Sequence, residues 1–409
     1  MKQRIVITGA STVTTFGIDK NNFFENIVSG RSCIREITKF PNRKIPSKLG
    51  GEISSEFLRN VIRDERLLRT TFISQIALAA GILCVEDAKI KITKDNSSKT
   101  GIFFATSQGS INAIEKIHKN LLGMGPQSVD PLLFAETVFN APASLLSIKL
   151  GIRGPCVVMP MGGGGSGFVL AYAIYYLRTG LIDCALVGAA DELSEAVREA
   201  YFHLGVLSPC DTKPEGSRPF DKTRNGMVLS EGGAFVMLET LSNAEKRNAH
   251  IYGEIIGFGM CSDGYRLADC DPTGIGVAMV IKKALNSAKI KKEVIDYICA
   301  FANSLRDLDL VEAKGIKAAL GDYAYKCPVS SIKGATGMLG ATGLFYNIII
   351  SCLAIKHNVI PPTINYKHFD PECNLNLVTN NPKIAKLKTV LVEGYCWGGI
   401  YNSFILRKV

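Results

Sequence analysis

Short apolar runs alternate with longer segments of helical periodicity along this 409-residue chain. The short runs are rich in β-branched residues, which favour strands, and the longer ones repeat apolar residues every three or four positions. The predicted strands are 4–8, 101–106, 156–159, 184–187, 233–238, 297–301, 328–331 and 389–392. The predicted helices are 71–87, 110–122, 166–179, 274–288, 309–320 and 343–356. This alternation predicts a layered α/β fold.

Two segments follow the same order of a strand, a glycine-rich turn and an apolar helix. The first turn holds Gly162 to Gly165, and the second has four glycines between Gly334 and Gly343. Each turn would place free backbone N–H groups at the start of a helix. The repetition predicts two similar halves, residues 1–252 (with cap insertions) and 253–409, and no Pro/Ser/Gly-rich linker separates them.

The composition indicates where in the cell the protein works, and it argues against a membrane span, disulfides and a metal site. Apolar residues make up 47% of the chain and charged residues 21%, which is typical of a globular protein with a large core. The longest apolar stretches, 167–177 and 343–355, are shorter than a membrane span, and the apolar run at 5–9 is too short for a signal peptide. We therefore expect a cytoplasmic protein without membrane contact. The twelve cysteines form no CxxC pair and have no His at ligand spacing, so reduced thiols and no metal are expected.

Net charge and the sequence of the first strand limit which partners and cofactors are expected to bind. The charge is +10, but the basic residues are dispersed with few aromatic residues among them, which does not favour nucleic-acid binding. An acidic protein partner or a merely solvated surface both remain open. The run Ile7 to Ser11 is followed by Gly17, too late for a dinucleotide-binding GxGxxG motif, so no cofactor is expected.

The four consecutive glycines are the strongest local signal. They could form an oxyanion or phosphate nest, let another chain or ligand approach the backbone, or simply make a tight packed turn. Ser166 follows them but is not in a GxSxG elbow, and it could equally cap the helix. None of the five histidines lies in a glycine-rich turn at a strand end, so no general base is indicated.

Several motifs resemble β-ketoacyl-ACP synthases, and they occur in that family's order along the whole chain. They are residues 4–9 (RIVITG), 217–221 (SRPFD), 228–234 (VLSEGGA), 360–365 (IPPTIN), and the closing Gly398-Gly399 with Asn402-Ser403. The resemblance implies the thiolase fold, with two similar βα halves in a five-layer αβαβα arrangement. This agrees with the repeated strand–glycine–helix order.

The same resemblance identifies the positions at which catalysis would occur. Family members use a Cys nucleophile at the start of a buried helix and two His residues, which serve thioester formation, decarboxylation and condensation. Here those positions hold Gly163, Phe301 and Met338, so no catalytic residue is expected. A group of polar residues remains where the family has such residues, and it is expected to be structural: Lys333, Asp309 and Glu312.

Within the family, the chain is similar to the chain length factors, or ketosynthase β subunits, of type II polyketide synthases. These lack the Cys, usually carrying Gln instead, so Gly163 departs from their pattern too. Further similar stretches are 35–40 (REITKF), 49–53, 125–129 and 307–313 (DLDLVEA). The resemblance implies a non-catalytic subunit that pairs with a Cys-bearing ketosynthase α subunit and an acyl carrier protein during malonyl condensation. The product would be an aromatic polyketide, such as an octaketide, or a polyene.

In chain length factors, helix side chains set the depth of the acyl tunnel. Ser110, Ala113 and Ile117 share one face of the matching helix, and either line the tunnel or form an ordinary packing face. Two other functions remain open. One is a stand-alone condensing or decarboxylating enzyme with its nucleophile relocated to Cys156 or Ser166, and the other is a homodimer that binds acyl chains.

Overall fold

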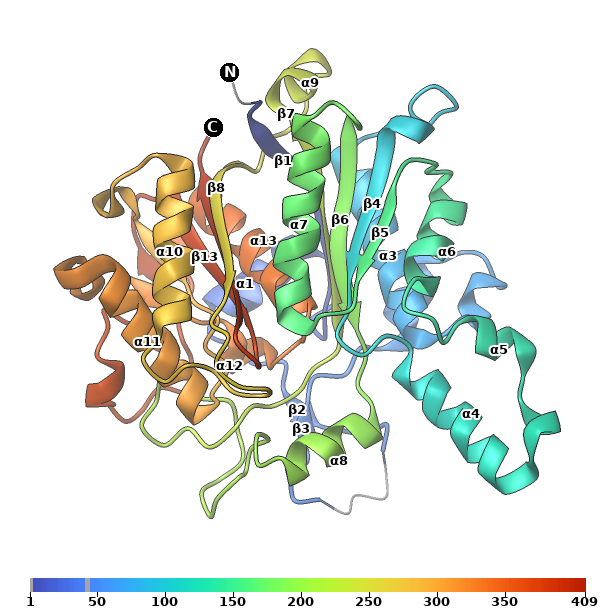
Figure 1. Ribbon diagram of the computed structural model, residues 1–409, viewed down its shortest axis with the longest axis horizontal. Helices are drawn as coiled ribbons and strands as arrows, with labels where there is room; N and C mark the ends of the chain where they lie inside the picture. The colour runs from blue at the N-terminus through green and yellow to red at the C-terminus, as the bar shows by residue number, and fades with distance from the viewer. Residues whose placement is uncertain (1–2, 41–44) are drawn as a thin grey trace.

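A computed structural model describes residues 3–40 and 45–409 (Figure 1). Its ten main strands follow the hydrogen-bonded order β10-β9-β13-β14-β8-β1-β7-β6-β4-β5. The strands are β1 (Ile5–Val13), β4 (Thr100–Ala105), β5 (Cys156–Met159), β6 (Cys184–Asp191), β7 (Gly232–Thr240), β8 (Gly253–Ser262), β9 (Tyr297–Cys299), β10 (Val329–Ser330), β13 (Thr389–Cys396) and β14 (Ile400–Arg407). The main helices are α1 (Lys20–Val28), α3 (Phe72–Ala88), α4 (Ile111–Met124), α5 (Pro131–Ala135), α6 (Ala141–Leu150), α7 (Gly162–Arg178), α8 (Glu195–His203), α10 (Ile275–Ala288), α11 (Arg306–Leu320), α12 (Lys333–Thr336) and α13 (Thr342–His357).

The two halves of the sheet repeat one topology. The order β5-β4-β6-β7-β1 matches β10-β9-β13-β14-β8 strand for strand. In each half the first three strands are parallel and the last two pair antiparallel with their neighbours. A short antiparallel pairing of β1 with β8 joins the halves. The internal duplication predicted from the glycine-rich turns is therefore confirmed.

Helices lie in three layers around these strands. Helix α3 packs on β1, β6 and β7, with α6 beside it, while α10 packs on β8 and β14 with α11 beside it. Between the two strand groups, α7 and α13 contact strands of both halves. Helix α13 is buried on every side from Thr342 to Ile355, as its continuous apolar sequence requires in a central layer. The five-layer α/β arrangement is thus observed (Figure 1).

The structure differs from the sequence prediction at several elements, among them the start of α7 and the unpredicted strands β8 and β14. Helix α7 begins at Gly162, so the four glycines form its first turn instead of a loop before it. Strand β8 was not predicted, because glycines interrupt its apolar pattern. A Cβ at Gly257 or Gly259 would lie 2.6 or 2.3 Å from a backbone oxygen of α10, so close strand–helix packing requires glycine at both positions.

Candidate functional site

Gly163, Phe301 and Met338 all line one cavity of about 240 Å³. Gly163 lies in the first turn of α7, Phe301 follows β9, and Met338 lies between α12 and α13. These elements come from both halves of the fold, and the cavity lies where the ends of the two central-layer helices meet. The three positions are therefore neighbours in space despite their separation in the chain.

The backbone around Gly163 leaves no room for a side chain. A Cβ at this position would lie 2.3 Å from the carbonyl oxygen of Tyr395 and 3.4 Å from that of Gly340. The first of these distances is far below a van der Waals contact, and both neighbours are backbone atoms that cannot rotate away. A thiol on residue 163 would require the end of β13 to shift.

Phe301 fills its position with an apolar ring. The ring is 3% exposed, and its centroid lies 5.3 Å from that of Tyr395. On another side the Lys333 ammonium nitrogen lies 4.8 Å from the ring centroid, within range of a cation–π interaction. Lys333 Nζ has no hydrogen-bond partner among the described residues, so the face of the Phe301 ring stabilises its charge in place of a hydrogen-bond acceptor.

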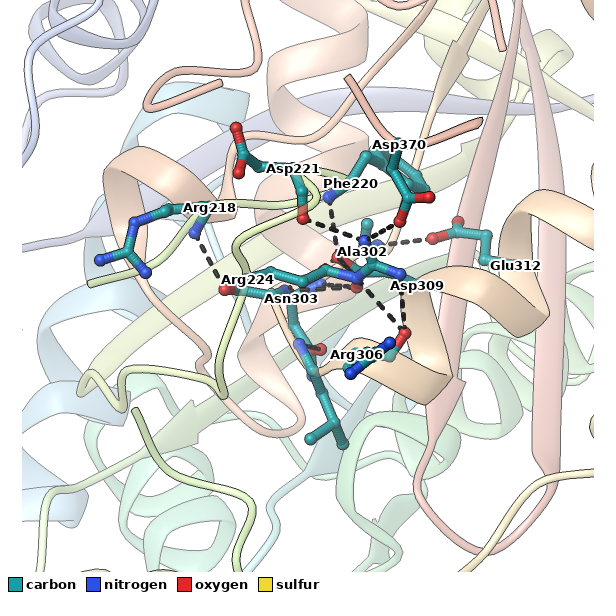
Figure 2. Close-up of polar contacts among 12 residues, drawn as sticks. Arg218, Phe220, Asp221, Arg224, Ala302, Asn303, Arg306, Asp309, Glu312 and Asp370 are labelled. Carbon is teal, nitrogen blue, oxygen red and sulfur yellow. Dashed lines mark hydrogen bonds and ion pairs between the residues drawn. The ribbon is translucent and has the colours of Figure 1, made fainter. Parts of the chain in front are cut away.

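Two buried carboxylates hold the segment that carries Phe301 and Asn303. Glu312 accepts hydrogen bonds from the backbone N–H groups of Phe301 (2.7 Å) and Ala302 (2.6 Å). Asp309 accepts from the N–H groups of Asn303 (2.8 Å) and Ser304 (3.2 Å). Both acids lie on α11, and together they fix the backbone at the cavity wall (Figure 2).

The Arg224 guanidinium partly balances the negative charge of these acids. Asp309 also accepts from Phe220 N–H at 2.8 Å and lies 3.8 Å from Arg224 Nε, while the other face of Arg224 bonds Asp370 (Figure 2). Burial raises the pKa of Asp309 to about 6, against the lowering effect of the Arg224 charge and of the backbone N–H groups. Burial likewise raises the pKa of Glu312 and lowers that of Lys333.

Met338 and Asn303 lie side by side in the cavity wall. The Asn303 amide nitrogen lies 3.7 Å from the Met338 sulfur and 3.9 Å from the Met227 sulfur. The Met338 backbone bonds Val228 and Ser230, which fixes the residue beside the segment 227–230. A thioether neither takes up nor delivers a proton at neutral pH, so this position supplies no acid or base.

The predicted tunnel residues lie apart from this cavity. Ala113 and Ile117 are buried on one face of α4, and Ser110 immediately precedes the helix, with its hydroxyl 3.4 Å from that of Thr71. None of the three is among the residues that line the cavity. The opposite end of α4 is exposed, with Leu122 and Met124 facing outward.

The two alternative nucleophiles lie elsewhere. Cys156 begins strand β5, as predicted, but this is the edge strand of the sheet, and Cys156 is exposed. The buried Ser166 hydroxyl donates to the carbonyl of Ala341 and does not line the cavity. Sequence reasoning missed Cys396 and Trp397, which do line it. The adjacent Gly398-Gly399 motif was the available signal.

The chemistry of the cavity follows from its lining. No histidine lines it among the residues that the structure describes, and its polar groups include the Asn303 amide, the Tyr201 phenol and the Cys396 thiol. Within residues 3–40 and 45–409, no cluster of three His, Cys, Asp or Glu could hold a metal ion. The cavity can thus enclose an apolar chain but offers no imidazole pair for decarboxylation.

Among residues 3–40 and 45–409, no helix is both long and apolar enough to cross a membrane.

Comparisons with known proteins identify relatives over the full length. The model of the β-ketoacyl synthase N-terminal domain matches residues 2–244, and that of the C-terminal domain matches residues 252–367. The 3-oxoacyl-[acyl-carrier-protein] synthase 2 of Coxiella burnetii (strain RSA 493 / Nine Mile phase I) is 34% identical over 412 residues, covering 100% of this chain and 99% of the relative.

Two solved structures are similar over 100% of both chains. The first is a type II polyketide synthase acyl-carrier protein in complex with its ketosynthase bound to the hexaketide (AntDE:AntF), with a TM-score of 0.92 and 26% identity. The second is the ishigamide ketosynthase/chain length factor, with a TM-score of 0.90 and 27% identity.

Proposed function

The chain belongs to the β-ketoacyl synthase family and has its thiolase fold. We propose that it has a non-condensing role, because Gly163, Phe301 and Met338 stand at the positions that the motif resemblance assigns to catalysis. It would act as the chain length factor of a type II polyketide synthase. Its partner would be a ketosynthase α subunit that retains Cys, His and His. The pair would extend malonyl units on an acyl carrier protein.

The crowded backbone at Gly163 is the observation that carries this proposal. A family nucleophile cannot occupy a position where a Cβ would lie 2.3 Å from the Tyr395 carbonyl oxygen. Phe301 and Met338 add no group that could move a proton. An enzyme that lost one of the family's three catalytic residues could keep a weak activity. Loss of all three removes both the thiol that holds the acyl group and the imidazoles that assist decarboxylation.

An apolar face at the sheet edge supports a stable partner. Of the 22 exposed large apolar side chains among the described residues, 12 fall between residues 121 and 181. They lie on α4, α5, α6 and α7 and in the loops beside them. Helices α6 and α7 pack on edge strand β5, and Figure 1 shows α4 and α5 on the same side of the molecule as α6. An edge strand leaves one row of backbone groups unpaired. We propose that the ketosynthase covers this face, in an interface above about 2,000 Å².

The α4 helix belongs to the same face and gives the subunit a means of setting chain length. We propose that Ser110, Ala113 and Ile117 border the far end of a tunnel that enters from the partner. Two of the three side chains are small, which leaves space for a long acyl chain. The product would be an aromatic polyketide, and the net charge of +10 suits an acidic carrier protein.

Native mass spectrometry of the tagged chain, purified from its source cells, tests the proposal. We expect a one-to-one complex with a ketosynthase whose sequence retains the Cys and both His residues. Tyr175→Lys, on the proposed interface, should weaken that complex, because it places a charge on an apolar contact. Tyr325→Lys is the matched control: both tyrosines are exposed (60% and 52%), but Tyr325 lies in the other half of the fold. A homodimer would overturn the proposal and favour a stand-alone acyl-binding protein.

A further inference from the structure

The Cys396 thiol lies against the glycines at the start of α7. Cys396 is the last residue of β13 and lines the cavity together with Gly162 and Gly163. A Cβ at position 162 would lie 3.2 Å from Cys396 Sγ, and a Cβ at position 164 would lie 3.3 Å from Cys396 Cβ. The space beside the empty nucleophile position is therefore occupied by a thiol from a different part of the chain.

The thiol lies beside the first turn of α7 and donates a hydrogen bond to the carbonyl oxygen of Trp397 at 3.4 Å. Burial raises the pKa of Cys396, and the nearby backbone N–H groups of Gly164 and Gly163 offset only part of this rise. Unpaired N–H groups in the first turn of a helix stabilise negative charge, and a thiolate is the reactive form of Cys. The first turn of the 17-residue α7 therefore offsets only part of the cost of burying a thiolate at Cys396.

Unsatisfied polar groups in the same cavity point to a ligand. The Ser230 side chain is 5% exposed and lines the cavity, and its hydroxyl has no hydrogen-bond partner among the described residues. Within that part of the chain, the second carboxylate oxygen of Glu192, also at the cavity, has none either. Buried polar atoms are normally paired, so both are positioned to bind polar atoms that an occupant brings.

The cavity that Cys396 lines adjoins a second cavity. A second cavity of about 450 Å³ shares Leu305, Leu308 and Trp397 with the first. Exposed side chains border this second cavity, Leu204 (57%) among them, so it opens to the surface. Trp397 therefore stands between an open outer cavity and the inner one, directly beside Cys396. A slender thioester arm could enter along this line.

We infer that Cys396 is a covalent acyl acceptor that takes an acyl group from a pantetheine-type thioester. The Cys396 sulfur attacks the carbonyl carbon and forms a new C–S bond, and the C–S bond to the pantetheine sulfur breaks. The thiol proton leaves on the pantetheine sulfur, so the exchange needs no oxidant, reductant or metal. Condensation does not follow, because Phe301 and Met338 replace the groups that would decarboxylate an extender. The chain would hold an acyl group without extending it.

The choice of acyl donor rests on the proposed function, whereas the placement of the thiol does not. The test uses the purified full chain, with any partner that co-purifies, incubated with hexanoyl-N-acetylcysteamine thioester. Proteolysis and mass spectrometry then locate the acyl groups. We expect the Cys396 peptide to be acylated at least about tenfold faster than the Cys210 peptide, because the cavity raises the effective concentration of bound donor. Cys396→Ser should abolish that adduct, and Cys210→Ser, which changes an exposed thiol outside the cavity, should leave it unchanged.

An unmodified Cys396 peptide, or one acylated no faster than Cys210, would overturn the inference and leave Cys396 as a packing residue. Co-purification reports separately on the subunit role. If the ketosynthase co-purifies but Cys396 is not acylated, this inference alone fails. If Cys396 is acylated but no ketosynthase co-purifies, the subunit proposal fails and the acyl-acceptor inference stands. Cys396→Ser keeps nearly the same volume, and retained partner binding by that variant shows that it is folded.

Discussion

Asp309→Asn should destabilise the fold strongly, because the Asp309 carboxylate holds the cavity wall. It accepts N–H groups from Phe220, Asn303 and Ser304, and it faces the buried Arg224. An asparagine keeps one acceptor oxygen but turns N–H donors toward the Phe220 N–H, which costs about 1–3 kcal/mol for the unpaired buried donor. Removing one partner of a buried ion pair costs about 3–5 kcal/mol, and less where a second acid remains, as Asp370 does. We expect a total loss of about 3–5 kcal/mol in the free energy of unfolding.

Urea unfolding followed by the fluorescence of Trp397, the only tryptophan of the chain, measures this loss directly. Asp307→Asn is the matched control, because Asp307 lies in the first turn of the same helix but is exposed. It should change stability by at most about 1 kcal/mol, the contribution of a charge near a helix start. If both variants lost the same small amount, the buried carboxylate would not hold the 301–304 segment, and the reasoning would be refuted.

Three further changes test separate parts of the account. Gly163→Cys should lower the free energy of unfolding by about 1–3 kcal/mol and restore no condensation, because its Cβ would meet the Tyr395 carbonyl. The control Gly123→Cys, which has open space around it, should leave thermal stability unchanged. A stable and active Gly163→Cys variant would contradict the crowding argument. Burial raises the pKa of Glu393 to about 7, so the folded state holds an extra proton between pH 4.5 and 7, and stability from this group falls as pH rises through that window. In urea titrations, the free energy of unfolding of Glu393→Gln relative to wild type should therefore rise by up to about 3 kcal/mol from pH 5 to pH 8. An equal difference at pH 5 and at pH 8 would show that the carboxyl is not buried as described. Ala113→Phe should shorten the polyketides made by the reconstituted pair, as measured by product mass, and unchanged lengths would remove α4 from the tunnel.

Much of the fold could be predicted because its signals are local. The strand–glycine–helix order predicts α7 and α13, and both lie in the central layer. Strand β8 was missed because packing against α10, which a local pattern does not contain, decides its glycines. The start of α7 was placed too late for a related reason. Glycine is a poor helix former, and only the neighbouring strands β13, β14 and β5 show why Gly163, Gly164 and Gly165 have no room for a side chain.

The site was predicted unevenly. Motif positions identified Gly163, Phe301 and Met338, and these three do line one cavity. Cys396 could not be associated with Gly163 in the same way, because the two meet only when the end of β13 packs on α7. Proximity between distant segments is a property of tertiary packing, which no periodicity in the sequence encodes. For the same reason, the sequence could not reveal that Ser166 faces the Ala341 carbonyl and is unavailable for chemistry.

The central claim is that this chain supports condensation without performing it. The most direct measurement incubates malonyl-loaded carrier protein with the purified chain alone, with its co-purified ketosynthase alone, and with the two together, and determines product masses. The account predicts no extension by the chain alone and full-length polyketide only from the pair. Extension of malonyl units by the chain alone would contradict the claim, because it would show that the cavity around Gly163 carries out condensation without the family's Cys and His residues.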